Sequence, residues 1–520
     1  MDTIEILFCA IFLSIIYLYY RFKNNYTYFE RNGIPYIKPV LFFGNVADWV
    51  FMKKPLPVVH FELYKKLEPH SFAGVYLGGK KTFLIRDAEL VKNILVKDFA
   101  CFRDRGIKRD PHDILSRNLF MMRGDDWKNL RIKLTSTFTS GKMKMMFPLV
   151  DECGSRLHEK MQKITDTDIL IKDVCSRFTT DVIGSCAFGL EINSLDDPDS
   201  EFRKIGNRIL DSSFTPVFRS IMRNMLPAVA KLSKHLHTDT TVQDFFVDLV
   251  QKTVKYREDN KIKRGDFLDL LINLKNDTSS QKSNDQQVQE DLTKFLDQLG
   301  ENHVKSNIAM TFELMTAQCF VFFIAGFETS SSTLSYMLLE LSQHQDIQQK
   351  VRQEIITVLQ KHDNQLSYDM LKELKYLDLV IAETLRKYPI TGNLVRECTQ
   401  TYKIPDSKTI IEQGTPVVIS ILGIHHNEKY YEKPNDFYPE HFTEQAKSKR
   451  PNYAYLPFGE GPRICIGERF AKMQIKVGVV NLLKDFSYHL SPKTKLPTQF
   501  TAGATINDVK GGIWLQCRKL

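Results

Sequence analysis

One cysteine of the sequence lies where its thiol could do chemistry. Cys465 stands between a stretch rich in glycine and proline, residues 458–463, and a stretch with helical apolar spacing that begins at Ile466. We therefore predict that Cys465 lies where a loop becomes a helix. Free N–H groups and the helix dipole stabilise a thiolate at such a position. The thiolate could be a nucleophile, a redox sensor or a metal ligand, and the alternative is a cysteine packed in the core.

The sequence singles out no base for a nucleophilic cysteine. His425, His426 and His441 precede Cys465, but no pattern typical of thiol proteases surrounds them. The nine cysteines form no CxxC pair and have no regular spacing, so neither a disulfide framework nor a zinc site is predicted. Reduced, mostly buried cysteines in a cytosol-facing protein fit this pattern best.

A second group of polar residues lies within the most apolar helical stretch. Residues 317–341 are apolar on almost every face, but Glu328, Thr329 and several serines interrupt them. A helix that is apolar all round is a membrane span or the central helix of a core, and these polar residues favour the core. The simplest role of Thr329 is a hydrogen bond to its own backbone four residues earlier. The alternative is proton transfer, for which Glu328 could supply the relay.

The spacing around Cys465 resembles a known motif. Phe458, Gly461, Arg463, Cys465 and Gly467 occupy all five specified positions of FxxGxRxCxG, the haem-ligand signature of the cytochrome P450 superfamily. Five such residues arise by chance in on the order of one chain in several thousand. The resemblance implies that haem b is the cofactor and that Cys465 is its metal ligand. A thiolate ligand pushes electron density towards iron-bound O2 and favours O–O cleavage.

The resemblance also assigns roles to the neighbours of Cys465. It implies that Arg463 pairs with a haem propionate. Phe458 would shield the sulfur, and Gly461 and Gly467 would let backbone N–H groups approach it and tune its potential.

Two further sequence patterns are similar to propionate-binding positions of the family. Trp127 and Arg131 match its WxxxR motif, and their spacing of four places them on one helix face. Without the other motifs, a surface arginine packed on the tryptophan would be the default explanation of this pair. Arg396 matches a further arginine that binds a propionate.

The sequence also contains the family's scaffold motif. Glu383 and Arg386 resemble ExxR, in which the two charges form a buried pair on the haem side. Residues 439–442, Pro-Glu-His-Phe, look like the PERF motif, with His441 where many members have arginine. The third contact of the charge cluster is therefore expected to be neutral or weaker.

Residues 325–330, Ala-Gly-Phe-Glu-Thr-Ser, match the motif of the oxygen-activating helix, (A/G)Gx(D/E)T(T/S). In the family, such a threonine and its neighbouring acid deliver protons through ordered water to oxygen bound at the iron. The resemblance therefore gives Thr329 and Glu328 catalytic roles, and implies that Gly326 makes room beside the haem.

The N-terminal segment indicates a membrane anchor. Residues 6–20 carry no charge, which is short for a spanning helix but tolerable with their flanks. Acidic residues precede this run and tyrosines end it, which argues against a cleaved signal peptide. Basic residues follow it, so the rest of the chain should face the cytosol. We predict an anchor over residues 1–22 in the endoplasmic reticulum membrane and a stiff, extended Pro/Gly-containing tether over residues 23–44.

The rest of the chain, residues 45–520, is predicted to be a single haem monooxygenase domain. Its class is mainly α with a minor β-sheet, and strand-like runs cover residues 72–85, 402–421 and 511–516. A polar stretch, residues 276–307, is predicted to be a surface loop. The resemblance implies the cytochrome P450 fold, with haem between the central long helix and the cysteine-ligand loop.

Charge and motifs limit the partners. The net charge of +9 suits an acidic partner or an anionic membrane surface, but no basic block or nucleic-acid-binding motif is present, so nucleic acid is not expected. No GxGxxG follows a predicted strand, so NADPH is not expected to bind here by that route. The resemblance implies electrons from NADPH–cytochrome P450 reductase, with cytochrome b5 as an additional donor. An acidic partner would dock on the predicted basic cluster Lys128, Arg131, Lys133, Lys142, Lys144 and Lys472.

Family analogy also points to a lipophilic small-molecule substrate. Five mostly apolar segments would line its pocket, residues 113–120, 210–218, 320–323, 391–394 and 500–502. Local similarity is greatest to insect microsomal P450s that metabolise xenobiotics, with residues 102–106, 134–144 and 325–332 carrying it. The predicted function is a monooxygenase that inserts one oxygen atom from O2 into a xenobiotic, plant toxin, insecticide or endogenous lipid or hormone. A haem enzyme that rearranges hydroperoxides without a reductase, or a non-catalytic haem-bearing carrier or sensor of lipophilic molecules, are the alternatives.

Overall fold

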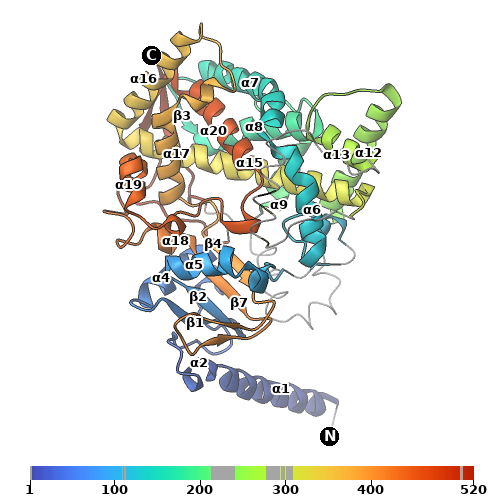
Figure 1. The fold of residues 1–520 in the computed structure, drawn as a ribbon, viewed down its shortest axis with the longest axis vertical. Helices are drawn as coiled ribbons and strands as arrows, with labels where there is room; N and C mark the ends of the chain where they lie inside the picture. The colour runs from blue at the N-terminus through green and yellow to red at the C-terminus, as the bar shows by residue number, and fades with distance from the viewer. Residues whose placement is uncertain are drawn as a thin grey trace.

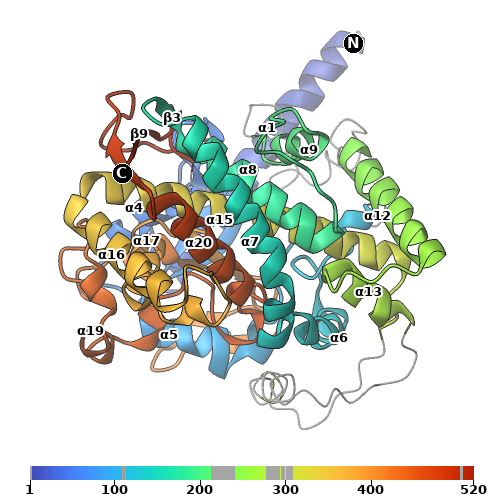
Figure 2. The same cartoon turned by 90° about the horizontal axis from the view of Figure 1, so that it is seen from above.

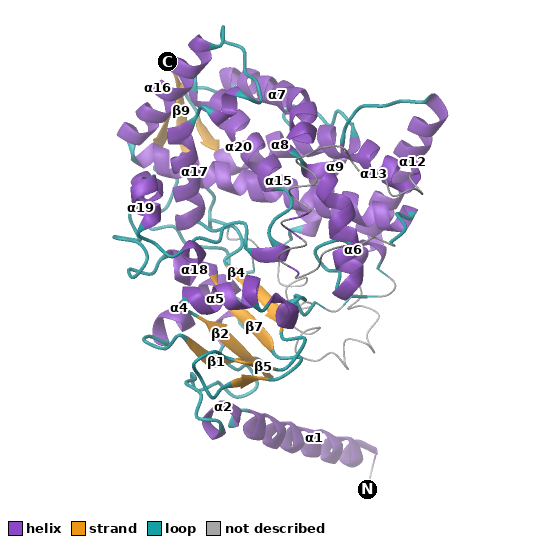
Figure 3. Cartoon of the chain, viewed as in Figure 1, coloured by secondary structure: helices purple, strands orange, loops and turns teal. Residues whose placement is uncertain are grey.

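The computed structural model describes residues 3–107, 109–110, 113–211, 240–276, 293, 295, 299, 308–503 and 508–520. A large helical body lies above a small sheet region, and helix α1 (Thr3–Asn25) projects below that region (Figures 1 and 3). The predicted class, mainly α with minor sheets, is confirmed. Most of the predicted polar loop over residues 276–307 lies outside the described residues.

Helix α15 (Phe312–Gln343) runs through the centre of the helical body. It packs against α8 (Ile171–Ile183), α17 (Lys375–Lys387) and α20 (Glu468–Leu483), and α20 also packs against α7 (Ser140–Lys163) (Figure 2). Among the described helices, α15 is the one long and apolar enough to cross a membrane. Its apolar faces are instead covered by these neighbours, which confirms the predicted core helix.

The larger sheet joins segments that are far apart in the chain. Its strand order is β1 (Phe72–Leu77), β2 (Lys80–Ile85), β7 (Pro416–Ser420) and β4 (Asn393–Glu397). Strand β2 pairs with β7 in parallel, and the other pairs are antiparallel. The pairing of β4 with β7 places Arg396 opposite Val417. Strand β4 is an edge strand of this sheet and lies next to the helical body (Figure 1).

The remaining elements are short helices and two smaller sheets. Strands β3 (Asp168–Leu170), β9 (Trp514–Lys519) and β8 (Phe486–Leu490) form one sheet, and β5 (Tyr402–Lys403) pairs with β6 (Ile410–Ile411). The other α-helices are α2 (Tyr28–Arg31), α3 (Ala47–Val50), α4 (Leu56–Lys66), α5 (Ala88–Lys92), α6 (Gly124–Thr135), α9 (Glu201–Ile209), α12 (Thr240–Asn260), α13 (Phe267–Asn276), α16 (Gln345–Lys361), α18 (Ile421–His425) and α19 (Glu444–Ser448). Shorter helical turns are η1 (Asn93–Lys97), η2 (Phe99–Phe102), η3 (Ile114–Arg117), η4 (Ser136–Phe138), η5 (Gly184–Phe188), η7 (Met370–Lys372), η8 (Pro439–Phe442), η9 (Asn452–Ala454) and η10 (Gly461–Arg463).

The three predicted strand regions contain strands, but β3, β4 and β8 were not predicted. These three strands have only three to five residues each, so alternation of apolar and polar residues is too short to reveal them. Their pairing partners lie at distant positions of the chain, and tertiary contacts rather than local sequence stabilise them.

The segment predicted as an extended tether, residues 23–44, packs on the domain instead. Helix α1 continues to Asn25, and α2 follows it. Phe29 is fully buried against Tyr76 and Phe83 of the sheet, with ring centroids 5.0 and 5.5 Å away. The prediction failed because it weighted the proline and glycine residues and not the aromatic residues between them, whose burial favours docking.

The close approach of α15 to α8 depends on Gly326. A Cβ atom at this position would lie 2.1 Å from Cδ1 of Ile183. We expect Gly326→Ala to destabilise the protein by about 1–3 kcal/mol, because Ile183 must move within a packed interface. The cost should be smaller in an Ile183→Val background, which lacks Cδ1. Unfolding of the four proteins of this cycle measures the coupling, and equal costs in both backgrounds would contradict the contact.

Candidate functional site

The cysteine loop is fixed by its own backbone. The N–H of Cys465 donates to the carbonyl of Phe458 (2.9 Å), and helix α20 begins at Glu468, directly after the N-cap Gly467. Cys465 therefore lies at the predicted loop-to-helix junction. Gly461 has a φ of +72°, and a Cβ atom there would lie 1.9 Å from the carbonyl oxygen of Leu95 in η1. This glycine thus lets the loop approach η1, a reason that differs from the predicted access to the sulfur.

The thiol of Cys465 is open on one side. Water reaches the side chain, yet burial is the strongest influence on the thiol and raises its pKa. A hydrogen bond from the N–H of Gly467 and the positive charges of Arg131 and Arg105 act in the opposite direction and lower the pKa. The negative charge of Glu468 adds to the effect of burial, so these donors and cations offset the effect of burial only in part and the pKa of the thiol stays raised.

Four arginine side chains converge near this cysteine. Arg131 on α6 and Arg396 on β4 are buried, and neither Nε atom has a hydrogen-bond partner among the described residues. Burial lowers the pKa of each to about 10. Burial and the charges of Arg396 and Arg131 lower the pKa of Arg105 to about 9. Burial and the charges of Arg105 and Arg396 lower the pKa of Arg463.

Only one carboxylate of the described chain opposes the charge of Arg463. Asp104 lies 3.4 Å from it, but the same carboxylate also binds Arg123 (3.1 Å) and the N–H of Gly124 (2.9 Å). Burying unpaired cations is costly, so the four-arginine cluster fits a ligand that carries more than one negative charge. Haem has two propionates and an iron that a thiolate can bind, so the residues present fit this cofactor.

Arg463 makes its contacts with the protein. Its guanidinium donates to the carbonyls of Arg103 (3.0 Å) and Met122 (2.8 Å) and stacks on the ring of Trp127 at 3.8 Å. It therefore ties the cysteine loop to the segment before α6. Its predicted propionate contact stays a prediction. Trp127 and Arg131 are both buried, so the alternative of a surface arginine packed on the tryptophan does not apply.

The structure separates the acid and the threonine of α15. The hydroxyl of Thr329 donates to the carbonyl of Ala325 at 2.6 Å, which is the backbone bond considered as the simplest role. Its oxygen can still accept a hydrogen bond. Glu328 is buried and faces α8, where Lys172 lies 2.8 Å from Oε1 and also donates to Ser332 at 2.6 Å. No hydrogen bond joins Glu328 to Thr329 within the described chain.

The exposure of α15 changes near the threonine. Ala325 is exposed in the middle of a mostly buried helix, and Thr329, one turn later, is half-buried. Gly326 lies between them, but the space that its missing Cβ provides is taken by Ile183 of α8. Its predicted role beside the cofactor stays a prediction.

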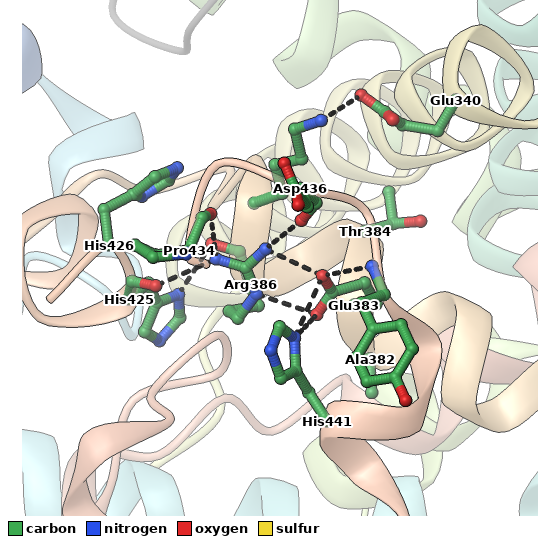
Figure 4. Close-up of polar contacts among 12 residues, drawn as sticks. Glu340, Ala382, Glu383, Thr384, Arg386, His425, His426, Pro434, Asp436 and His441 are labelled. Atoms are coloured by element: carbon green, nitrogen blue, oxygen red, sulfur yellow. Dashed lines mark hydrogen bonds and ion pairs between the residues drawn. The ribbon is translucent and has the colours of Figure 1, made fainter. Parts of the chain in front are cut away.

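The predicted Glu383–Arg386 pair is present and fully buried (Figure 4). Nε and Nη2 of Arg386 donate to the two oxygens of Glu383, each at 2.7 Å. The remaining donors reach backbone carbonyls of His425, Pro434 and Asp436. Burial raises the pKa of Glu383, but hydrogen bonds from Arg386 and His441 outweigh it and leave the pKa below its usual value.

His441 makes the third contact of this cluster. Nδ1 lies 3.2 Å from Oε2 of Glu383, and Nε2 lies 2.8 Å from the carbonyl of Glu432 (Figure 4). Both partners can only accept, so the ring satisfies both only with a proton on each nitrogen. In that form it is a cation, as an arginine would be, so the contact that was expected to be neutral or weaker can carry a full charge.

The sequence analysis missed two residues of the site. Arg105 belongs to a segment that was noted only for its similarity to insect proteins, and its contribution to the arginine cluster depends on folding. Lys172 carries no recognisable motif. One predicted role needs correction, since Arg131 is buried and cannot be part of a reductase-docking surface.

The chain belongs to the cytochrome P450 family, whose family model matches residues 34–513. It is 38% identical to "Probable cytochrome P450 6a13" of Drosophila melanogaster, covering 99% of both chains. It is 40% identical to "Probable cytochrome P450 6a18" of the same species, covering 98% of this chain and 97% of the other. It is 38% identical to "Cytochrome P450 6k1" of Blattella germanica, covering 98% and 96%. The resemblance to insect cytochromes P450 is confirmed, and membership implies a haem-thiolate monooxygenase that uses O2.

The four-arginine cluster predicts opposite effects in the haem-free and haem-loaded proteins. Arg396→Leu removes an unpaired buried charge, so the haem-free protein should be at least as stable as before. Haem affinity should fall about 10- to 100-fold, because a charge-assisted hydrogen bond is lost. Thermal unfolding of both forms measures this difference. The control Arg123→Leu breaks ion pairs with Asp104 and Glu397 and should destabilise both forms alike. A loss of stability confined to the haem-free Arg396→Leu protein would contradict the account.

Proposed function

We propose that this cytochrome P450 takes electrons from NADPH through a separate reductase and inserts one oxygen atom into a lipophilic small molecule. The observation that carries the proposal is the cluster of buried arginines, with two unpaired Nε atoms, beside an accessible cysteine. A dicarboxylate cofactor with a thiolate-bound metal satisfies both features. In this proposal haem lies between α15 and the cysteine loop, where Ala325 and Cys465 are exposed.

Each site residue has a definite part in this proposal. Bound haem supplies the site for O2 binding and the electronic means to cleave O–O. Cys465 is the thiolate ligand, and the N–H of Gly467 limits the charge on its sulfur. The hydroxyl of Thr329 donates its hydrogen bond to the carbonyl of Ala325. Its oxygen is therefore left to accept a hydrogen bond and to orient a proton donor.

In this proposal Glu328 relays protons, and Lys172 positions its carboxylate. The ammonium group of Lys172 donates hydrogen bonds to Glu328, Ser331 and Ser332. These bonds hold the carboxylate of Glu328 on the side of α15 that faces α8. A proton from Glu328 must therefore travel around α15 through water to reach the side on which Thr329 lies. The carbonyl of Phe458, which accepts from the N–H of Cys465, and the close approach of Gly461 to η1 fix the shape of the cysteine loop.

A lipophilic substrate is supported by the aromatic residues of α15. Phe323 is buried in a group of rings that includes Phe202 and Phe246, at centroid distances of 5.7 and 5.5 Å. A cavity of about 320 Å³ near the start of α15 is lined by Arg109, Asp110, Arg117 and Asp126 among others, and is too charged to be this pocket. Of the predicted lining segment 210–218, residues 212–218 lie outside the described residues.

The proposed location is the cytosolic face of the endoplasmic reticulum. Helix α1 has 23 residues, and at 1.5 Å per residue its length of about 34 Å matches the roughly 30 Å hydrocarbon core of a bilayer, which supports the proposed anchor by length alone. Residues 1–22 would be the anchor, and residues 45–520 the haem domain. Reductase, with cytochrome b5 as a further donor, would dock on the basic cluster without Arg131, namely Lys128, Lys133, Lys142, Lys144 and Lys472.

The reduced, carbon monoxide-bound difference spectrum of membranes that express the chain tests the cofactor and its ligand. The native chain should give a Soret band at about 450 nm, and Cys465→Ser should lose the band together with all turnover. Turnover should also require NADPH and reductase. Activity of Cys465→Ser would contradict the ligand assignment. Turnover of hydroperoxides without reductase would favour the rearranging enzyme, and haem without turnover would favour the carrier or sensor.

Thr329→Ala tests the part of the threonine. We expect haem binding to persist, but product formed per NADPH to fall by about tenfold or more as electrons are diverted to peroxide. Thr329→Ser keeps the hydroxyl and should stay close to the native coupling. Product, peroxide and NADPH consumption measure the effect. Native coupling in Thr329→Ala would show that the hydroxyl has only its backbone role.

A further inference from the structure

His425 lies between the Glu383–Arg386 pair and the start of the cysteine loop. It is the last residue of α18 and is fully buried. Its backbone carbonyl accepts from Nη1 of Arg386 (3.0 Å), and its Nδ1 lies 3.2 Å from the carbonyl of Arg386 (Figure 4). Its Nε2 accepts from the backbone N–H of Leu456 at 2.9 Å. One side chain therefore contacts both α17 and the segment that leads into the loop.

The two contacts fix the state of the ring. The N–H of Leu456 can only donate, so Nε2 must carry a lone pair. The carbonyl of Arg386 can only accept, so Nδ1 must carry the proton. Burial, followed by the charge of Arg386, holds the pKa of His425 well below its usual value, so the ring stays neutral. The same two partners therefore determine both the tautomer and the orientation of the ring.

Backbone hydrogen bonds connect the segment that begins at Leu456 to Cys465. The carbonyl of Leu456 accepts from the N–H of Gly459 (3.1 Å), and the carbonyl of Phe458 accepts from the N–H of Cys465 (2.9 Å). The neighbours of Leu456 are also tied, because the hydroxyl of Tyr455 donates to the carbonyl of Ala382 on α17 (3.0 Å). The ring of Tyr455 stacks on that of His425 at 5.4 Å. The start of the loop is thus positioned from α17 by one histidine and one tyrosine.

We propose that His425 is a positioning residue for the metal ligand, which couples the Glu383–Arg386 pair to the cysteine loop through the N–H of Leu456. This inference rests on the proposed function, in which Cys465 binds haem iron. It goes beyond the family's ion pair because it assigns the connection between that pair and the cysteine to one nitrogen atom, Nε2 of His425.

Two amide substitutions separate the two ring nitrogens. The amide of His425→Gln reaches the position of Nε2 and can accept from Leu456, but it loses the donor to Arg386. The amide of His425→Asn occupies the position of Nδ1 and can donate to Arg386, but it leaves the N–H of Leu456 without an acceptor. Each variant leaves one buried backbone group unpaired, so both should lose a similar amount of thermal stability, on the order of 2 °C.

The readout is the conversion of the carbon monoxide-bound thiolate form, absorbing at about 450 nm, to the form at about 420 nm in which the thiolate ligand is lost. We expect His425→Asn to convert about five- to tenfold faster than the native protein, and His425→Gln to convert at nearly the native rate. The control His426→Asn should convert at nearly the native rate, since the described contacts of the His426 side chain are the carbonyl of Leu422 in α18 and the ring of Phe61, neither of which belongs to the cysteine loop. Equal rates for His425→Asn and His425→Gln would overturn the inference.

Hydrogen exchange at the amide of Leu456 covers the case in which a variant folds poorly. In the native protein this amide should be protected as strongly as those of α17, and the protection should persist in His425→Gln but not in His425→Asn. Rapid exchange of Leu456 in the native protein would overturn the inference without any variant. If the native protein lacks the band at about 450 nm, the proposed function fails, and the exchange data still decide whether His425 holds this segment.

Discussion

The buried positive charge beside Cys465 constrains the rest of the structure. Arg105, Arg131, Arg396 and Arg463 come from four separate segments. Burial lowers the pKa of each, the charges of their neighbours lower those of Arg105 and Arg463 further, and Asp104 is the one described carboxylate that opposes Arg463. A protein interior does not stabilise such a group by itself, because the desolvation of each cation is not repaid. The cluster is explained if an anionic ligand supplies the negative charges that balance these arginines. In the proposed function, the two propionates of haem supply these negative charges, and the cluster would favour haem over neutral ligands.

The charge of Arg386, by contrast, is balanced within the protein. Every described donor of the Arg386 guanidinium has a partner, and these partners are Glu383 and three backbone carbonyls. This charge is balanced within the protein, so it can hold α17, α18 and the segment around Asp436 together whether or not a ligand is bound. The segment that leads into the cysteine loop is therefore bound to this scaffold through His425, and the loop itself carries Arg463 of the cationic cluster. Such an arrangement positions the side chain of Cys465 in the haem-free protein, so that the ligand is preorganised for haem binding.

Local patterns could be predicted from the sequence, and contacts across the chain could not. The loop-to-helix junction at Cys465 and the apolar helix around Thr329 follow from residue types within a few positions, and both predictions agree with the structure. Lys172 lies 156 residues from Glu328, and no spacing rule connects them. The contact between Gly326 and Ile183 of α8 also joins distant positions of the chain, so no local pattern could predict it.

The central claim of the proposal is that the arginine cluster binds the two carboxylates of haem. The most direct test is to express the chain in a haem-deficient host supplied with haem or with haem dimethyl ester, which has the same iron and ring but no propionate charges. We expect haem to load and to give the thiolate band at about 450 nm, and the ester to load at least about 100-fold more weakly, since two or more charge-assisted hydrogen bonds are lost. Equal loading of haem and its ester would contradict the account.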